Sequence, residues 1–141
     1  MGIFKESATL ESLNKWSRNT LAEHLGIEFT GIGDNYLEAR MPVNDHTRQP
    51  FGLLHGGASV ALAETLGSVA AALCVDPTKF CVGLEINANH IKGVRDGFVK
   101  GITKPVHIGK QTQVWEIRLT NEADELVCIS RITLAVLEKK K

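Results

Sequence analysis

Residues 55–76, HGGASVALAETLGSVAAALCVD, decide the fold of this chain. Glu64 is the only charged residue between His55 and Asp76, and every other residue between them is apolar, small or hydroxyl-bearing. A helix that is apolar all round belongs inside a protein. The stretch therefore predicts one long helix buried at the centre of the fold.

Glu64 is the residue in this helix that needs an explanation. A buried carboxylate is costly unless it is paired or used, and no Lys or Arg lies within reach along the helix. Its local partners are Thr65 and Ser68, the latter one turn further on the same face. Carboxylates with shifted pKa values gather at active sites, so Glu64 is a candidate catalytic group. The alternative is a structural Glu bonded to backbone or to a partner helix.

Composition limits the classes of function. The chain has 141 residues, which predicts one domain over 1–141 with flexible ends at 1–9 and 138–141. Its 16 basic and 16 acidic residues balance, so the total charge favours neither nucleic acid nor an anionic membrane as a partner. The first residues lack the apolar core of a signal peptide, and Ala58 to Val75 is too polar to span a membrane.

The three cysteines, Cys74, Cys81 and Cys128, form no paired framework and no C-x-x-C motif. Each lies in an apolar stretch, where a free thiol behaves as a small hydrophobic group. An odd thiol count without an export signal predicts a reducing, cytoplasmic location.

Outside the long helix, most of the chain alternates between apolar and polar residues, which is typical of strands. The spacing predicts a helical lead over Leu10–Leu25 with a cap at Thr9 or Ser12, and a hairpin over Ile27–Met41 that turns at Gly33–Asn35. After an irregular loop and the long helix, the pattern predicts strands over 82–89, 98–106, 113–119 and 126–137. In the first of these, Val82, Leu84, Ile86 and Ala88 share one face. The connections are too short for helical crossovers, so the sheet is expected to be antiparallel.

A thin helix explains how such a sheet can close. Nine Gly and Ala residues between Gly56 and Ala72 let strands approach the helix closely. The predicted class is α+β, with a long central helix wrapped by a curved antiparallel sheet. This arrangement resembles the hot-dog fold.

Specific motifs point to one family with this fold. Residues 49–57, QPFGLLHGG, with Glu64 seven residues beyond Gly57, resemble the hot-dog acyl-CoA thioesterases. Residues 82–90, VGLEINANH, and the Val114–Trp115 pair also fit, and the likeness runs from about Leu10 to Leu137. It is greater for the aromatic acyl-CoA branch, which includes 4-hydroxybenzoyl-CoA thioesterases and the hydrolases of 1,4-dihydroxy-2-naphthoyl-CoA in menaquinone biosynthesis.

The resemblance implies a cytoplasmic, cofactor-free hydrolase of aromatic acyl-CoA that assembles as a homotetramer. It places the catalytic site at Gln49, His55, Gly56, Glu64 and Ser68. It places coenzyme A contacts at Gly83, His90, Lys92, Gly93, His107, Gly109 and Lys110.

Elementary chemistry supports parts of this assignment. The helix begins at Gly56 and Gly57, where N–H groups lack intrahelical partners and can bind an acyl oxygen; tight packing alone would also explain the glycines. Gln49 could polarise the carbonyl or simply be solvated, and His55 could bond the substrate or cap the helix. Glu64 would attack the thioester carbon or activate a water. Ser68 could orient either group or bond its own backbone.

Distance along the helix adds a prediction about assembly. Gly56 and Glu64 are eight residues apart, which is about 12 Å at ~1.5 Å per residue. Both must lie within roughly 3 Å of one reacting centre. One helix cannot easily supply both groups, whereas a symmetric homodimer can pair Glu64 of one subunit with Gly56 of the other.

Basic residues near strand ends are candidates for the phosphates of coenzyme A: His90, Lys92, Arg95, His107, Lys110 and Arg131. The Ile108–Lys110 turn is a plausible phosphate loop, although surface basic side chains are mostly solvated. The five His residues show no metal-ligand spacing, so no metal is expected.

Two other functions remain open at this level. An enoyl-thioester hydratase or dehydratase of the same fold would also use a His and a carboxylate from opposing subunits. A non-catalytic acyl-CoA-binding protein would keep the fold without turnover.

Overall fold

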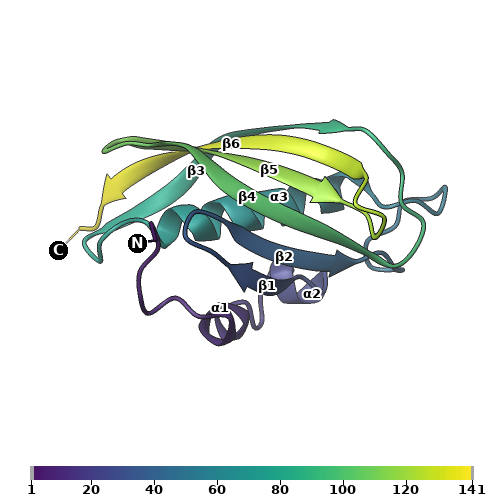
Figure 1. Ribbon diagram of the computed structural model, residues 1–141, viewed down its shortest axis with the longest axis horizontal. Helices are drawn as coiled ribbons and strands as arrows, with labels where there is room; N and C mark the ends of the chain where they lie inside the picture. The colour runs from purple at the N-terminus through teal and green to yellow at the C-terminus, as the bar shows by residue number, and fades with distance from the viewer. Residues whose placement is uncertain (1, 141) are drawn as a thin grey trace.

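A computed structural model describes residues 2–140 of the chain (Figure 1). Within this range the helices are α1 (Leu10–Trp16), α2 (Leu21–His24) and α3 (Gly56–Ala72). The strands are β1 (Glu28–Ile32), β2 (Leu37–Pro42), β3 (Lys79–His90), β4 (Phe98–Ile108), β5 (Thr112–Thr120) and β6 (Leu126–Glu138). The predicted hairpin, long helix and four later strands are all present.

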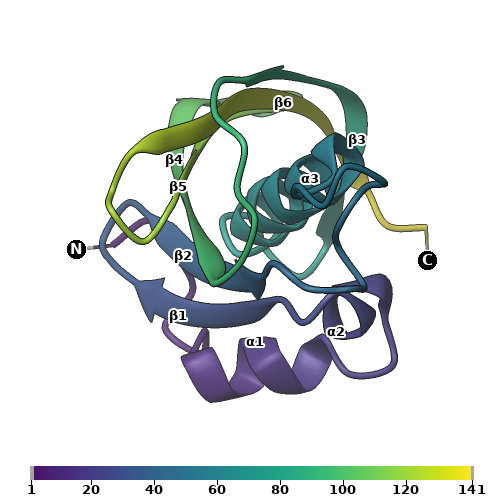
Figure 2. The ribbon, with the colours of Figure 1, turned by 90° about the vertical axis from the view of Figure 1, so that its right-hand side faces the viewer.

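The strands form one antiparallel sheet in the order β1-β2-β4-β5-β6-β3. The sheet curls around α3, which lies on its concave side (Figure 2). This confirms the hot-dog fold that the sequence predicts. Because β3 is the last strand after a crossover, its far edge pairs with no other strand of the described chain.

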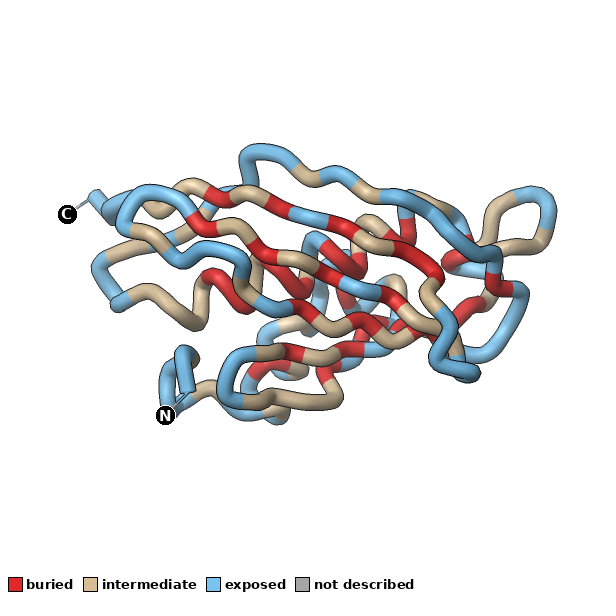
Figure 3. Tube along the Cα trace, turned by 45° about the horizontal axis from the view of Figure 1, so that its top comes forward, coloured by how far each residue is buried: buried red, intermediate tan, exposed pale blue. Residues whose placement is uncertain are grey.

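Close contact between helix and sheet depends on small residues, as expected. A Cβ at Gly67 would lie 2.5 Å from Cγ2 of Ile132, and one at Gly101 would lie 2.6 Å from Cδ1 of Leu66. Around them pack fully buried side chains such as Trp115. Buried positions alternate along the strands that face α3 (Figure 3). The core therefore fills the space between α3 and the curved sheet.

The prediction that α3 is buried on all sides is wrong for the single chain. One face, including Leu62, Leu66 and Ala70, is fully buried, but Glu64 is exposed. The sheet covers only part of the helix, and Figure 2 shows a side of α3 between β3 and α2 that no strand covers. An apolar sequence cannot distinguish covering by the same chain from covering by another. No helix within residues 2–140 is long and apolar enough to cross a bilayer.

The helical lead is two helices rather than one. Thr9 caps α1, with reciprocal hydrogen bonds between Thr9 and Ser12. The chain then breaks at Asn19, whose φ of 62° is left-handed, before Thr20 opens α2. Asn tolerates this conformation better than most residues because its side chain can bond locally. The apolar spacing continued across the break and concealed it.

The predicted alternation along β3 also needs correction. The register with β6 shifts between Gly83 and Glu85, so this strand contains a β-bulge. The extra residue reverses the alternation. As a result Gly83 faces α3 together with Ile86, whereas Leu84 is 62% exposed.

α1 protects the opposite edge of the sheet. The Asn14 side chain accepts the Phe29 N–H at 2.8 Å and donates to the Phe29 carbonyl oxygen at 3.1 Å. Asn14 thus completes the backbone hydrogen bonding of β1, an edge strand, at this residue.

Candidate active site

The N-terminus of α3 presents one free backbone donor. His55 is the N-cap residue, and its Nδ1 accepts the Gly57 N–H at 2.8 Å. The Ala58 and Ser59 N–H groups both donate to the His55 carbonyl oxygen. Within residues 2–140, the Gly56 N–H has no acceptor. Since the positive end of the helix dipole lies here, this N–H can donate a hydrogen bond to an anionic or carbonyl oxygen.

Gln49 lies in the loop that leads into α3. Its Oε1 accepts the Phe51 N–H in a short hydrogen bond, and its backbone carbonyl accepts the Gly52 N–H. The turn requires glycine because Gly52 has a φ of +82°. With Oε1 occupied, the amide nitrogen of Gln49 is the end left to donate.

A cavity of about 300 Å³ joins these groups. Its walls come from the loop before α3, the first turn of α3 and the segment after β3. They consist of Gln49, Leu53, Leu54, Gly56, Ser59, His90, Ile91, Lys92, Gly93 and Val127. Three predicted coenzyme A residues, His90, Lys92 and Gly93, therefore lie beside Gly56. Ser59 was not among the predicted residues, although a hydroxyl one turn into an apolar helix was a usable signal.

Lys92 is already engaged in this cavity. Its Nζ lies 2.6 Å from Oε2 of Glu125. Hydrogen bonds from Lys92 and Asn121 lower the pKa of Glu125 below its usual value. A phosphate at Lys92 would thus compete with an existing ion pair.

Glu64 and Ser68 lie further along α3 and do not line this cavity. Glu64 faces Gly83, where a Cβ would be 3.3 Å from Glu64 Oε2. Ser68 is half-buried on the next turn of the helix. The structure thus separates Glu64 from Gly56 within one chain, as the helix geometry requires.

The other predicted coenzyme A segment lies near Gly83 rather than near His90. Gly83 pairs with Leu134, Leu134 with Gln113, and Gln113 with Ile108, so these residues form one row across the sheet. His90 is seven residues further along β3, about 23 Å at ~3.3 Å per residue. His107 contacts the turn at Gly109, where Nε2 lies 2.6 Å from the position of a Cβ. Gly109 and Lys110 line a surface depression with Asp76 and Lys79.

The predicted residues therefore fall into two groups within one chain. We name Gln49, His55, Gly56, His90, Lys92 and Gly93 the N-terminal half-site. We name Glu64, Ser68, Gly83, His107, Gly109 and Lys110 the mid-helix half-site. The first contains the free Gly56 N–H and the Gln49 amide, which can donate hydrogen bonds to a carbonyl oxygen. The second contains the Glu64 carboxylate.

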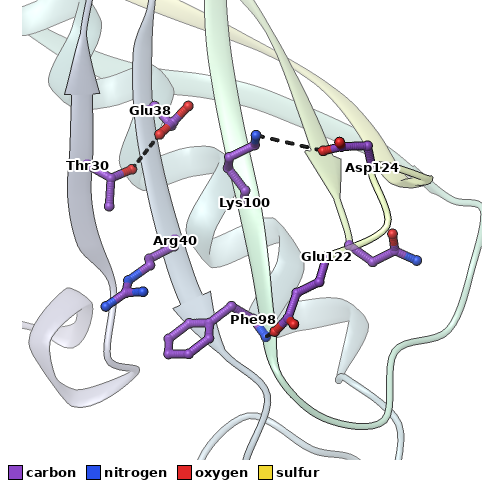
Figure 4. Close-up of a pocket in the computed structure, with 8 residues that line it drawn as sticks. Thr30, Glu38, Arg40, Phe98, Lys100, Glu122 and Asp124 are labelled. Atoms are coloured by element: carbon purple, nitrogen blue, oxygen red, sulfur yellow. Dashed lines mark hydrogen bonds and ion pairs between the residues drawn. The ribbon is translucent and has the colours of Figure 1, made fainter.

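A further depression, of about 270 Å³, lies on the outer face of the sheet (Figure 4). It contains none of the predicted residues, and its charged side chains already have partners. Glu38 accepts a hydrogen bond from the Thr30 hydroxyl, and Glu122 accepts one from the Phe98 N–H. Arg40 bonds Glu28 at 3.0 Å and lies over the Phe98 ring, while Lys100 is 3.9 Å from Asp124. This depression offers no free reactive group.

The cysteines pack with apolar groups: Cys128 is buried, and Cys74 and Cys81 are half-buried against the core. Burial raises the pKa of Cys74 to about 11 and also raises the pKa of Cys81 and of Cys128. A protonated thiol is a poor nucleophile and a poor metal ligand. Among residues 2–140, no three His, Cys, Asp or Glu side chains are grouped to hold a metal ion.

Comparison with known proteins identifies the family. The model of the thioesterase superfamily matches residues 51–128. The chain belongs to the thioesterase superfamily. The match includes both Gly56 and Glu64, and the protein is accordingly a thioester hydrolase with the hot-dog fold.

The names of individual relatives also describe thioesterases. The 1,4-dihydroxy-2-naphthoyl-CoA hydrolase of Escherichia coli is 52% identical over 135 residues, which cover 96% of this chain and 99% of that protein. The proofreading thioesterase EntH of Cronobacter turicensis is 53% identical, with 96% and 98% covered. The crystal structure of the thioesterase HI1161 from Haemophilus influenzae superimposes with a TM-score of 0.94 at 48% identity, covering 96% of this chain and 95% of that chain.

Proposed function

We propose that this thioesterase hydrolyses acyl-CoA with an aromatic acyl group. The observation that carries the proposal is the free Gly56 N–H at the positive end of α3, in a cavity that Gln49 also lines. A thioester oxygen here would accept hydrogen bonds from Gly56 and from the Gln49 amide. Donors fixed in this way stabilise the negative charge that develops on the oxygen during attack.

The carboxylate would come from a second copy of the chain. Glu64 belongs to the mid-helix half-site and lies too far along α3 to reach the thioester held by its own Gly56. A two-fold dimer with antiparallel α3 helices would join each N-terminal half-site to the partner's mid-helix half-site, giving two equivalent sites. Glu64 then attacks the thioester carbon or activates a water, and Ser68 orients it. The family resemblance implies that two such dimers associate as a tetramer.

The same pairing would suit the length of coenzyme A. His90 and Gly93 from one chain and Gly83, His107, Gly109 and Lys110 from the other would flank the pantetheine arm and the nucleotide. This division explains why the two predicted segments are far apart in the single chain.

The identity of the acyl group is inferred from the named activity of the Escherichia coli relative, at 52% identity. We propose 1,4-dihydroxy-2-naphthoyl-CoA, the substrate of menaquinone biosynthesis, as the first compound to test.

A panel of thioesters tests the proposed function. Thiol release is measured with 1,4-dihydroxy-2-naphthoyl-, benzoyl-, phenylacetyl- and medium-chain acyl-CoA. We expect kcat/KM to be at least about tenfold higher for the aromatic compounds than for the medium-chain ones, a difference that pocket contacts can supply. A medium-chain preference would contradict the aromatic assignment. Hydration of enoyl-CoA without thiol release would contradict the hydrolase itself.

A further inference from the structure

The imidazole of His90 lies directly over the first residue of α3. A Cβ at Gly56 would be 3.0 Å from His90 Nε2 and 3.2 Å from Cε1. Adding the Cα–Cβ bond, Nε2 is at most about 4.5 Å from the Gly56 Cα. His90 ends β3 and Gly56 begins α3, so the fold brings together two residues that are far apart in the sequence.

This position is next to the Gly56 N–H, the donor proposed above for the thioester oxygen. A carbonyl oxygen bonded to the Gly56 N–H would lie about 2.9 Å from that nitrogen. The thioester sulfur is attached to the same carbonyl carbon. A substrate whose sulfur points toward the His90 side of Gly56 therefore brings that sulfur close to the imidazole.

His90 is also the basic side chain of this cavity that forms no ion pair among the described residues. Among the described residues that line it, His90 and Lys92 are those with a transferable proton on a basic nitrogen. Lys92 is held by Glu125 at 2.6 Å. Histidine is the side chain suited to donate and recover a proton near neutral pH.

We propose that His90 donates a proton to the departing thiolate sulfur. This inference rests on the proposed function and deepens it. When the tetrahedral intermediate collapses, the carbonyl re-forms, the C–S bond breaks and its electron pair goes to sulfur. The imidazolium N–H proton passes to that sulfur, giving the free thiol and a neutral imidazole.

The proton balance is closed by the attacking water. Glu64 takes one proton from that water, and this proton returns through solvent to His90, so each turnover consumes one thioester and one water. If Glu64 instead forms an anhydride first, the thiol leaves by the same step.

Three benzoyl thioesters distinguish this role from others. Benzoyl-CoA and benzoyl-N-acetylcysteamine both release alkyl thiols that need a proton, whereas S-(4-nitrophenyl) thiobenzoate releases a stable thiolate. We expect His90→Gln to lower kcat by about 10²-fold for the first two, the lower end for loss of a general acid. For the nitrophenyl ester we expect a change of less than about threefold, because its leaving group needs no acid. His24→Gln, at an imidazole on α2, serves as the matched control.

Each other result overturns the inference. Equal losses on all three thioesters indicate that His90 only shapes the helix terminus. A loss on benzoyl-CoA alone indicates a contact with the nucleotide, which the cysteamine thioester lacks. No loss on any substrate removes His90 from the reaction. If the unaltered protein hydrolyses none of the three, the proposed function fails and this inference fails with it.

Discussion

Glu64 and Gly83 face each other, and a Cβ on residue 83 would lie 3.3 Å from Glu64 Oε2. The bulge in β3 creates this relationship because it turns Gly83 toward α3. We expect Gly83→Ala to displace the Glu64 side chain and to lower kcat by roughly tenfold, since small misplacements of a reacting group are costly. Gly31→Ala is the matched control, because its Cβ would be equally close, at 3.3 Å, to Glu38 Cβ. Equal activity of both variants would show that Gly83 does not position Glu64.

Replacing the carboxylate tests its chemical role. Glu64→Gln keeps the size of the side chain but removes the charge, and turnover of an aromatic acyl-CoA should fall by at least ~10²-fold. Because Glu64 is exposed in the chain, the free energy of unfolding should change by no more than about 0.5 kcal/mol. Steady-state kinetics and a denaturant melt check both parts. A folded variant with near-normal turnover would make Glu64 structural.

Mixed dimers test whether the site is shared. Gln49→Ala damages the N-terminal half-site and Glu64→Gln the mid-helix half-site. In a refolded equimolar mixture, half of the dimers contain one of each chain, and each such dimer has one intact site out of two. The mixture should therefore recover about a quarter of the wild-type activity. Native mass spectrometry confirms the exchange. Mixed dimers as inactive as their parents would place each site within one chain.

Partial burial of Cys74 raises its pKa and makes a prediction about its reactivity. With a pKa of about 11, roughly one thiol in 3,000 is ionised at pH 7.5. Alkylation by iodoacetamide should be slow at this pH and should accelerate about tenfold per pH unit up to pH 10. Peptide mapping by mass spectrometry measures the rate at each cysteine. The urea-unfolded chain is the control, and its rate should level off near pH 9, about the ordinary thiol pKa. The same profile in the folded chain would contradict the raised pKa of this thiol.

Asn14 carries a stability prediction. Asn14→Ala leaves the Phe29 N–H and carbonyl without their side-chain partners, and should cost about 1–3 kcal/mol of unfolding free energy. Asn35→Ala, in the exposed turn between β1 and β2, is the control, and urea denaturation is the measurement. A loss no larger than that of Asn35→Ala would mean that water replaces Asn14 at the β1 edge.

Features with a clear local signal were predicted well from the sequence, and features without one were not. Alternation and turn residues located the strands well because those signals are local. The orientation of Gly83 was missed because a bulge adds one residue with little sequence signal beyond the glycine. The break at Asn19 was missed because Ser and Asn interrupt a helix only weakly.

The site was predicted less completely than the fold. Residue types around Gly56 and Glu64 indicated the chemistry, and helix geometry indicated their separation. The closeness of His90 to Gly56 depends on where β3 ends relative to α3, a tertiary fact without a local pattern. The exposure of Glu64 was missed because composition does not reveal which part of a helix its own sheet leaves uncovered.

The free edge of β3 affects how newly made chains behave during synthesis. Its residues Lys79–His90 carry backbone N–H and C=O groups along a long outer edge, with Val82 and Leu84 exposed on the strand. Such an edge can add a strand from any nearby chain. While this edge is uncovered, newly made chains are exposed to aggregation, which becomes more frequent as their concentration rises. Yield on expression should depend on temperature and induction rate more than the stability of the finished core would indicate.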